Sequence, residues 1–372
     1  MGVILLFGLL YFLFSALFWV VSSPERDSKT KLIQAQELID NSQKLVTNPT
    51  AFNKTIEEAE KILFELRDKR VYMTDTQSLL GRIEAMKKEV NDIQTIDMTK
   101  LNAVMSYTPE QISALGVFEY NKKLNLIGTD SAILWYTRGE ALPLSKGYPT
   151  GEKAKAFDFT EDGEYFILTE GNRLLGKRGN DIAYITNNGK NEWSESHIIS
   201  TFNGNVYLAG SGWESVTRYR PGINGFSQWT TYIDNLWWKI VDIAIDGGIY
   251  ILLQDGKIIR YIGGTTSTTK SLSINKVPWE YNIGSEDVTQ VFSQPNLSYT
   301  YVLSGRNIWI FSPDSKRFQD VTAWNYVAQL ELQGTEEVRG INIPRDGLVY
   351  ITTNNHVYEL PFEVADGKII LR

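Results

Sequence analysis

Short runs of alternating apolar and polar residues, separated by turn residues, fill most of the chain beyond about residue 105. The clearest example is residues 241–264, V-D-I-A-I-D-G-G-I-Y-I-L-L-Q-D-G-K-I-I-R-Y-I-G-G, which holds two Asp-Gly dipeptides nine residues apart. Alternation with a period of two residues is typical of a strand with one buried face. Asp-Gly readily adopts the positive φ angles of a tight hairpin turn. The segment therefore predicts consecutive antiparallel strands.

The same unit occurs six times between about residue 105 and the C-terminus. Each copy begins with a turn, carries apolar residues three and five positions later, and continues through a second turn into another strand. The first turns begin 41 to 50 residues apart, at Asn121, Asp162, Asn203, Asp246, Asn296 and Asp346. Four-stranded units of about 40–50 residues are typical of the blades of a β-propeller.

A single sheet of this kind has two apolar faces and cannot bury both of them alone. If each sheet stacks between two neighbours, every face is buried, and aromatic side chains can fill the diverging space between sheets. We therefore predict a mainly β fold, a six-bladed β-propeller over residues 105–372. An open β-sandwich is the alternative, but sandwiches do not show a six-fold repeat in register.

The stretch D-G-G-I-Y-I-L-L-Q-D-G-K-I-I-R-Y resembles the six-bladed propellers of the NHL and TolB-like group. Blades of that group combine an Asp/Asn-Gly turn, a strand with Tyr, and a strand with basic and aromatic residues. Asp162, Asn203, Asp246 and Asp346 carry the likeness best. The resemblance implies a propeller but leaves the activity open, because the group includes scaffolds, ligand sensors, secreted enzymes and peptidoglycan-associated proteins.

Residues 23–104 show a longer period, with apolar residues three and four positions apart. Charged residues such as Glu57, Lys61 and Glu65 occupy the other faces. Such stripes are typical of amphipathic helices. Their apolar members are Leu32, Ala35, Ile39, Phe52, Ile56, Leu63, Leu66, Leu79, Ile83, Met86 and Val90. We predict a helical spacer, formed by one or two hairpins or by a coiled coil through which the chain forms a homo-oligomer.

Residues 3–21 contain no charge, and as a helix they would rise about 28 Å, close to the roughly 30 Å hydrocarbon core of a bilayer. We predict a transmembrane signal-anchor over residues 1–22 that is not cleaved. The alternative is a cleaved signal peptide, which usually has a basic start and a shorter apolar run.

The anchor predicts a single-pass protein of the cell membrane. Arg26, Lys29 and Lys31 follow the apolar run, and the positive-inside rule taken alone would keep the propeller in the cytoplasm. A single anchor with a spacer and a large all-β domain more often displays that domain outside, so we expect an extracytoplasmic propeller. This arrangement resembles the outer half of bacterial transmembrane sensor proteins.

The composition of the chain excludes several kinds of partner and site. The net charge is −7 and the sequence pI is near 5.2, which argues against a nucleic-acid partner. The absence of cysteine excludes disulfides, thiolate metal sites and cysteine nucleophiles, and only His197 and His356 could supply an imidazole. There is no G-x-S-x-G nucleophile motif and no metal-binding histidine pair. No catalytic residue or organic cofactor is predicted.

One polar constellation interrupts the apolar strands. Four residues before the first turn, three blades carry a polar residue: Asp158, Asp242 and Asn342. Equivalent positions lie at equivalent radius in a propeller, so these side chains are expected to face the central channel. Their oxygens could bind a cation such as Ca²⁺. The alternative is that each one accepts a hydrogen bond from neighbouring backbone.

A second candidate surface is aromatic. Trp213, Trp237, Trp238 and Trp279 cluster between turns or at blade ends. Exposed on one face, they could stack on sugar rings or anchor a peptide, whereas packing between blades is the structural alternative.

The function predicted from these features is a non-enzymatic, membrane-tethered propeller that binds a protein, a peptide or a cell-envelope glycan, as a scaffold or sensor ectodomain. The first alternative is a propeller-type hydrolase or lyase with its site at the mouth of the central channel. A second is a sensor half that works with a separately encoded cytosolic enzyme.

Overall fold

The computed structural model describes residues 26–372, apart from residues 179–180, 211–214, 234–238, 263–267, 276–287, 317–319 and 366–367. The chain divides into two compact units, one that ends at Ile93 and one that begins at Gln94. The predicted anchor, residues 1–22, lies outside the described residues. Within the described ranges, the helices lack the length and hydropathy that a membrane crossing requires.

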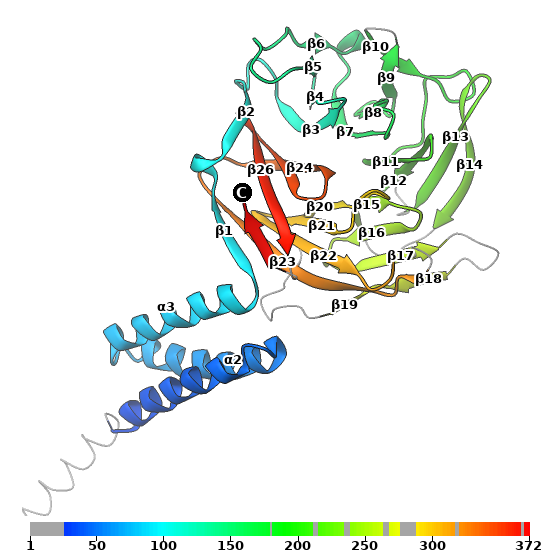
Figure 1. Ribbon diagram of the computed structural model, residues 1–372. Helices are drawn as coiled ribbons and strands as arrows, with labels where there is room; N and C mark the ends of the chain where they lie inside the picture. The colour runs from blue at the N-terminus through cyan, green and yellow to red at the C-terminus, as the bar shows by residue number, and fades with distance from the viewer. Residues whose placement is uncertain are drawn as a thin grey trace, which may run out of the picture. The chain divides into compact units, whose positions relative to one another are not determined.

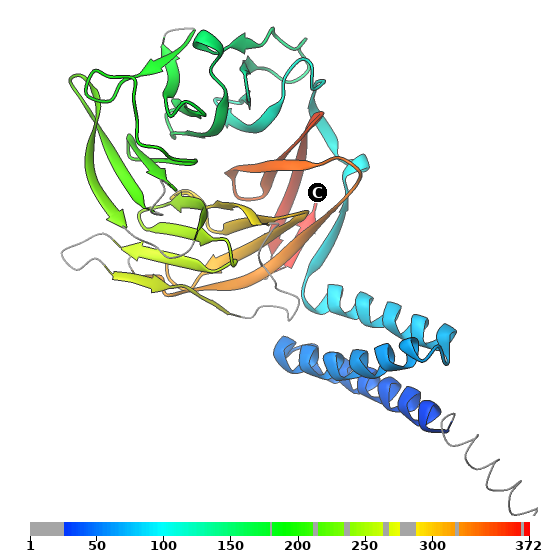
Figure 2. The same cartoon turned by 180° about the vertical axis from the view of Figure 1, so that it is seen from behind.

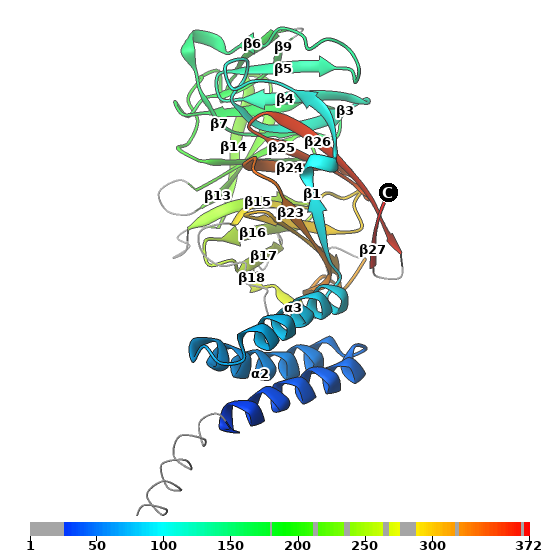
Figure 3. The same ribbon diagram turned by 90° about the vertical axis from the view of Figure 1, so that its left-hand side faces the viewer.

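The first unit is built of three helices. Residues 26–42 are helical and are followed by the 3-10 helix η1 (Gln43–Leu45), by α2 (Pro49–Asp68) and by α3 (Met73–Val90). Helices α2 and α3 pack side by side (Figure 3). The three helices bury the predicted stripes against one another, with a core of Ala35, Ile39, Phe52, Ile56, Ala59, Leu63, Leu66, Leu79 and Ile83.

These contacts confirm the helical pattern and agree with the hairpin form of the predicted spacer. The expected coiled coil is not supported, because the apolar stripes that would line an oligomer seam are already buried within one chain.

The described residues of the second unit form six sheets, built mainly of antiparallel strands, that follow one another along the chain and stand around a common centre (Figures 1 and 2). Blade 1 comprises β3 (Ala114–Tyr120), β4 (Lys123–Gly128), β5 (Ser131–Tyr136) and β6 (Lys146–Gly147). Blade 2 comprises β7 (Ala154–Phe159), β8 (Tyr165–Thr169), β9 (Leu174–Arg178) and β10 (Asp181–Ile185). Blade 3 comprises β11 (Ile198–Phe202), β12 (Asn205–Ala209), β13 (Val216–Gly222) and β14 (Gly225–Ile233). Blade 4 comprises β15 (Ile240–Ile245), β16 (Ile249–Leu253), β17 (Ile258–Ile262) and β18 (Thr268–Ser271).

Blades 5 and 6 include strands from distant parts of the chain. Blade 5 comprises β20 (Val288–Phe292), β21 (Thr300–Ser304), β22 (Asn307–Pro313) and β23 (Ala323–Gln333), and β23 also pairs with β1 (Ile93–Asp97) and β19 (Ser273–Asn275). Blade 6 comprises β24 (Val338–Arg345), β25 (Leu348–Thr353) and β26 (His356–Ala365), and β26 also pairs with β2 (Asn102–Ser106) and β27 (Lys368–Leu371). The 3-10 helix η2 (Met98–Lys100) lies between β1 and β2, and η3 (Pro149–Gly151) lies between β6 and β7.

The predicted repeat is confirmed in all six blades. Each predicted first turn lies between the first and second strands of a blade, and the strand residues that follow it are buried. In blade 3, Asn203 and Gly204 have φ angles of 48° and 68°, which is the left-handed backbone that a two-residue hairpin requires. The six-bladed propeller is therefore correct, and the β-sandwich alternative is wrong.

Neighbouring blades share apolar layers, as the closure argument requires. Phe118 of blade 1 stacks on Phe159 of blade 2, with ring centroids 4.7 Å apart. Tyr250 of blade 4 packs against Trp324 of blade 5 at 5.0 Å. Continuous buried clusters also join blades 2 and 3, blades 3 and 4, blades 5 and 6, and blades 6 and 1.

The ring is closed by a strand from the start of the second unit. Strand β2 lies beside β26 (Figure 1). In their register, Ser106 lies opposite His356. The hydroxyl of Tyr107 then donates to the carbonyl of Thr353 at 2.7 Å. The sequence boundary at residue 105 lies inside this strand. In β2 only Val104 and Met105 are buried, so its sequence shows no extended alternation.

A polar network crosses the same seam between blades 6 and 1. Both terminal nitrogens of Arg138, which follows β5, donate to the Glu359 carboxylate on β26 at 2.8 Å. Arg138 also donates to the hydroxyl of Tyr350 on β25, which in turn donates to Glu119 on β3. Bidentate guanidinium–carboxylate pairs are stronger and more directional than single contacts.

Replacement of Arg138 by Met should weaken this seam. The substitution keeps the apolar stem but leaves Glu359, whose side chain is 16% exposed, without its bidentate partner. We expect the free energy of unfolding to fall by about 1–2 kcal/mol, measured by chemical denaturation of the full chain.

The matched control is Arg339→Met, which removes the exposed pair with Glu337 and should cost less than about 0.5 kcal/mol. Equal effects of the two substitutions would show that the Arg138 network adds nothing beyond an ordinary surface pair.

Candidate functional site

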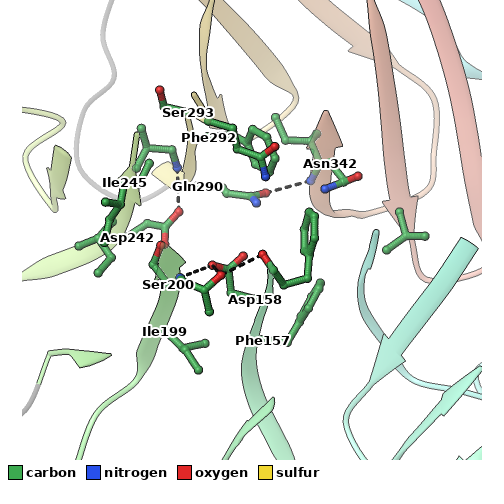
Figure 4. A pocket seen from close by; sticks show the side chains of 18 residues that line it. Phe157, Asp158, Ile199, Ser200, Asp242, Ile245, Gln290, Phe292, Ser293 and Asn342 are labelled. Carbon is green, nitrogen blue, oxygen red and sulfur yellow. Dashed lines mark hydrogen bonds between the residues drawn. The ribbon is translucent and has the colours of Figure 1, made fainter. Parts of the chain in front are cut away.

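The first strands of the six blades surround a central cavity. Strands β3, β7, β11, β15, β20 and β24 each contact the next one around the ring, and residues from or just after these strands line a cavity of about 110 Å³. The predicted residues Asp158, Asp242 and Asn342 all lie on its wall. These three residues, from blades 2, 4 and 6, therefore lie on one wall, as the periodicity of the sequence predicted (Figure 4).

Asp158 connects blade 2 to blade 3. Its Oδ2 accepts a hydrogen bond from the backbone N of Thr201 at 2.5 Å and another from the Thr201 hydroxyl at 3.0 Å. The Thr201 hydroxyl also donates to the carbonyl oxygen of Phe159 at 2.9 Å. The carboxylate thus satisfies a backbone donor of the neighbouring blade, as the structural alternative proposed.

Asp242 makes the equivalent connection from blade 4 to blade 5. Its Oδ2 accepts a hydrogen bond from the backbone N of Val291 at 2.8 Å. Gln290 repeats the arrangement one blade further, because its Oε1 accepts from the backbone N of Ile341 at 2.9 Å (Figure 4). Three side chains of the cavity wall therefore join adjacent blades through the same kind of hydrogen bond.

Gln290 was not predicted from the sequence, and the reason lies in the hairpin of blade 5. Residues 293–299 separate β20 from β21, so this hairpin is longer than the Asp-Gly and Asn-Gly hairpins. Counting four residues back from Asn296 gives Phe292 instead of Gln290. The signal in the sequence that could have identified Gln290 was a polar residue two positions before Phe292.

Asn342 differs from the other three. Its side chain is 2% exposed, it lines the cavity, and its Oδ1 has no hydrogen-bond partner among the described residues. An unpartnered buried polar atom is costly. Among the described residues, the Asn342 Oδ1 is therefore a buried acceptor that no donor satisfies.

The electrostatics of the cavity are strongly acidic. Burial raises the pKa of Asp158 to about 6, against the opposing effect of its hydrogen bonds from Phe159, Thr201 and Ser200. Burial also raises the pKa of Asp242 to about 7, and the charge of Asp158 contributes to this rise. None of the described residues on the cavity wall is a lysine, arginine or histidine.

A metal site made of side-chain acids and imidazoles alone is not present in the described part of the chain, where no three His, Cys, Asp or Glu side chains cluster suitably. A cation in the cavity would need amide, hydroxyl or water oxygens in addition to Asp158 and Asp242. Hard cations accept such mixed oxygen ligands.

The second predicted surface is the tryptophan face. Trp213, Trp237, Trp238 and Trp279 all lie outside the described residues, and their contribution to a ligand face stays a prediction.

The cavity opens toward the face that carries the six first turns, called here the first-turn face. Four of its lining residues, Phe159, Thr201, Ile245 and Gln294, also line a depression of about 430 Å³ on that face. Glu161 and Asp162 of blade 2 and Asn203 of blade 3 form part of the wall of this depression.

Two more depressions continue it around the ring. One of about 680 Å³ shares Gln294 and Pro295 with the first, and one of about 520 Å³ shares Ser298 and Tyr299 with the second. The three together form an arc from blade 2 to blade 6, called here the first-turn groove.

Comparison with known proteins supports the fold alone. No protein-family model and no curated protein matches the sequence. The β-propeller domain of Cps50 (Swd1) from Myceliophteria thermophila is similar, with a TM-score of 0.50, 9% identity, and coverage of 73% of this chain and 88% of that one. Hsv2 from Kluyveromyces lactis has a TM-score of 0.45 at 10% identity, over 70% of this chain and 85% of that chain. YCF48 bound to D1 peptide has a TM-score of 0.40 at 12% identity, over 72% of this chain and 96% of that chain.

The raised pKa values predict a pH dependence of stability in chelator-treated protein. A carboxyl whose pKa is higher in the folded than in the unfolded state stabilises the fold at low pH. That contribution is lost as the pH rises through the folded-state pKa. For Asp242 this window runs from about pH 4 to about pH 7. Asp242→Asn keeps an acceptor for Val291 and removes the charge. As the pH rises from 5 to 8, the free energy of unfolding of Asp242→Asn should increase by about 1–3 kcal/mol relative to that of wild type.

Denaturant titrations at the two pH values, both with chelator, measure this difference. Asp162→Asn, an exposed first-turn substitution that keeps a turn-compatible residue, is the control and should follow wild type at both values. If Asp242→Asn also follows wild type at both, then Asp242 carries no charge penalty in the fold.

Proposed function

We propose that this protein is a non-enzymatic binding propeller that holds an extended polypeptide in the first-turn groove. The observation that carries the proposal is the continuity of the groove, whose three depressions share residues from blade 2 to blade 6. A continuous arc suits an extended chain better than a compact small molecule, which a single pocket would surround.

The groove is held in shape by its central loop. Residues 293–299 border all three depressions, and both neighbouring blades hold this loop. Asp246 of blade 4 accepts a hydrogen bond from the Ser293 hydroxyl at 2.8 Å. Asp346 of blade 6 accepts from the backbone N of Ser298 at 2.9 Å and 3.1 Å. A preformed groove reduces the ordering cost of binding.

The charge of the depression next to blades 2 and 3 supports a basic ligand. In the depression next to blades 2 and 3, Glu161 and Asp162 are exposed, and no lysine or arginine is among its described lining residues. Near blade 6, by contrast, Arg345 and Arg372 are paired with Glu119 and Glu363. We infer that the polypeptide carries a lysine or arginine that lies beside Glu161 and Asp162.

A glycan ligand receives less support from the groove. Sugar recognition relies on exposed aromatic faces, whereas Phe159, Phe202 and Tyr299 in the groove are only partly exposed. The predicted tryptophan face lies outside the described residues, so glycan binding is kept as an outcome of the test. Membership of the NHL and TolB-like group also stays a prediction.

A charge reversal tests the binding site. Peptides would be selected from a random display library on the full chain and measured by fluorescence anisotropy. Selected peptides should be rich in lysine or arginine. Glu161→Lys should lower their affinity for the chain about tenfold, equivalent to about 1.4 kcal/mol.

Glu170→Lys is the matched control. Glu170 is also an exposed turn residue of blade 2, but it lies in the second turn, at the opposite end of the strands. It should change affinity less than about twofold. An equal loss of peptide affinity in both variants would indicate general charge attraction. A glycan ligand would be favoured if the library yields no binding peptide and the chain binds soluble peptidoglycan fragments.

The proposal includes a membrane tether through residues 3–21 and an extracytoplasmic propeller. What supports it is the uncharged run of a length that fits the bilayer. Because the chain has no cysteine, an introduced one is a unique probe. Leu144→Cys, at a position 93% exposed in blade 1, should react with a membrane-impermeant maleimide in intact cells.

Ile223→Cys in blade 3 provides an independent second site, and the cysteine-free parent chain gives the background. Reaction of both sites only after the cells are lysed would place the propeller in the cytoplasm, and release of the chain into the medium would indicate a cleaved signal peptide.

A further inference from the structure

The middle section of the first-turn groove is the largest of its three depressions. It has a volume of about 680 Å³, is lined by residues of blades 4 and 5, and is called here the blade 4–5 depression. Ligand pockets typically measure roughly 300–1,000 Å³. The blade 4–5 depression is therefore large enough to receive a whole side chain of a bound polypeptide.

Apolar side chains reach this depression from two segments of blade 5. Leu297 and Tyr299 belong to the loop 293–299, and both are half-buried. Pro313, at the end of β22, is also half-buried, and Val321 beyond it is buried. Half-exposed apolar surface that surrounds a hollow can be covered by an apolar group of a ligand, which removes that surface from water.

Hydrogen bonds hold both segments in place. The loop 293–299 is bonded to blades 4 and 6, as described above. In the second segment, the Asp314 carboxylate accepts from the backbone N of Thr322 at 3.0 Å and from its hydroxyl at 2.6 Å. The buried Arg260 donates through Nη1 to the carbonyl of Val321 at 2.6 Å. The shape of the depression is thus formed before a ligand arrives, which lowers the ordering cost of binding.

The charges around the blade 4–5 depression offset one another. Burial raises the pKa of Asp246, and the positive charge of the nearby Arg260 is among the effects that oppose this rise. At the surface, Asp314 and Lys316 carry opposite charges. The depression next to blades 2 and 3, by contrast, has exposed acids and no lysine or arginine among its described lining residues. An uncharged side chain therefore suits the blade 4–5 depression better than a charged one.

The depression near blade 6 is less suited to an apolar group. Its wall includes the charged residues Arg345, Asp346, Glu359, Glu363 and Arg372. An apolar side chain placed there would remove water from these groups without offering them hydrogen bonds, and this costs free energy.

We propose that the polypeptide in the first-turn groove places a large apolar side chain, aliphatic or aromatic, in the blade 4–5 depression. The inference rests on the proposed function and adds a second determinant to the lysine or arginine beside Glu161 and Asp162. The two depressions share Gln294 and Pro295, so the two ligand residues lie at a constant separation along an extended chain. Apolar anchors in preformed pockets carry much of the affinity of an interface.

The first test examines the ligand. Peptides are selected from a random display library on the full chain, and the aligned sequences should show a large apolar residue at a constant separation from the lysine or arginine. Replacement of that apolar residue by serine in a selected peptide should weaken binding to the wild-type chain at least about tenfold, measured by fluorescence anisotropy. This measurement does not depend on the folding of any variant.

The second test examines the wall of the depression. Leu297→Asn nearly keeps the size of the side chain and replaces its apolar end by an amide, so it should lower the affinity for the selected peptide about fivefold or more. The serine-substituted peptide should bind this variant about as well as it binds wild type, because the contact is already lost. Circular dichroism and chemical denaturation check that the variant folds.

Leu144→Asn is the matched control. Leu144 is 93% exposed in blade 1 and is not among the described lining residues of the three depressions. The control substitution should change the affinity for the selected peptide less than about twofold.

The outcomes separate this inference from the proposed function. Selected peptides whose affinity depends on Glu161, but which carry no apolar residue at a constant separation, would overturn the inference and leave the proposed function standing. Equal effects of Leu297→Asn and Leu144→Asn would do the same. If the library yields no binding peptide, the proposed function fails and the inference fails with it.

Discussion

The constraint on which this structure depends is that a sheet with two apolar faces needs two neighbours. Each of the six sheets buries both faces only when the row of sheets returns to its beginning, and the shared layers between blades show how completely this is achieved. Phe118 on Phe159 and Tyr250 against Trp324 fill the widening space between sheets with large side chains. Every other feature follows from the ring, including its narrow centre and its two loop-bearing faces.

At the centre of such a ring, strands converge from six directions, and polar side chains there meet one another whatever their separation in sequence. Asp158 and Asp242 use this position to accept backbone N–H groups from the next blade. The same convergence holds two carboxyl groups together in a small volume, where burial raises the pKa of both. Cohesion between blades and the electrostatic character of the cavity therefore arise from the same residues.

Much of the fold and of the central cavity could be predicted from the sequence because the repeat is regular. A constant distance from the Asp-Gly and Asn-Gly turns identified Asp158, Asp242 and Asn342 as equivalent positions, and the structure places them on one wall. Gln290 escaped this count because the hairpin after β20 is longer than the others. Strand β2 was not predicted, because only two of its five residues are buried and its sequence therefore shows no alternation of apolar and polar residues.

The groove on the first-turn face could not have been predicted from periodicity. Its shape depends on residues 293–299, which belong to the least regular copy of the repeat, and on hydrogen bonds from Asp246 and Asp346 on either side. Turn sequences report backbone geometry well, but they carry little information about which loops from distant blades lie next to each other.

The pairing of β2 with β26 also has a consequence for biosynthesis. Tyr107 and Thr353, which meet at this closure, are 246 residues apart in the chain, so β2 must wait until almost the whole propeller has been translated. Until then, the nascent chain carries a lone strand, and blade 6 emerges last with an unoccupied edge that matches it. Contacts of such long range form slowly. On a polysome, β2 of one chain can insert into blade 6 of another, and exchange of this strand is the misassembly to which this topology is most exposed.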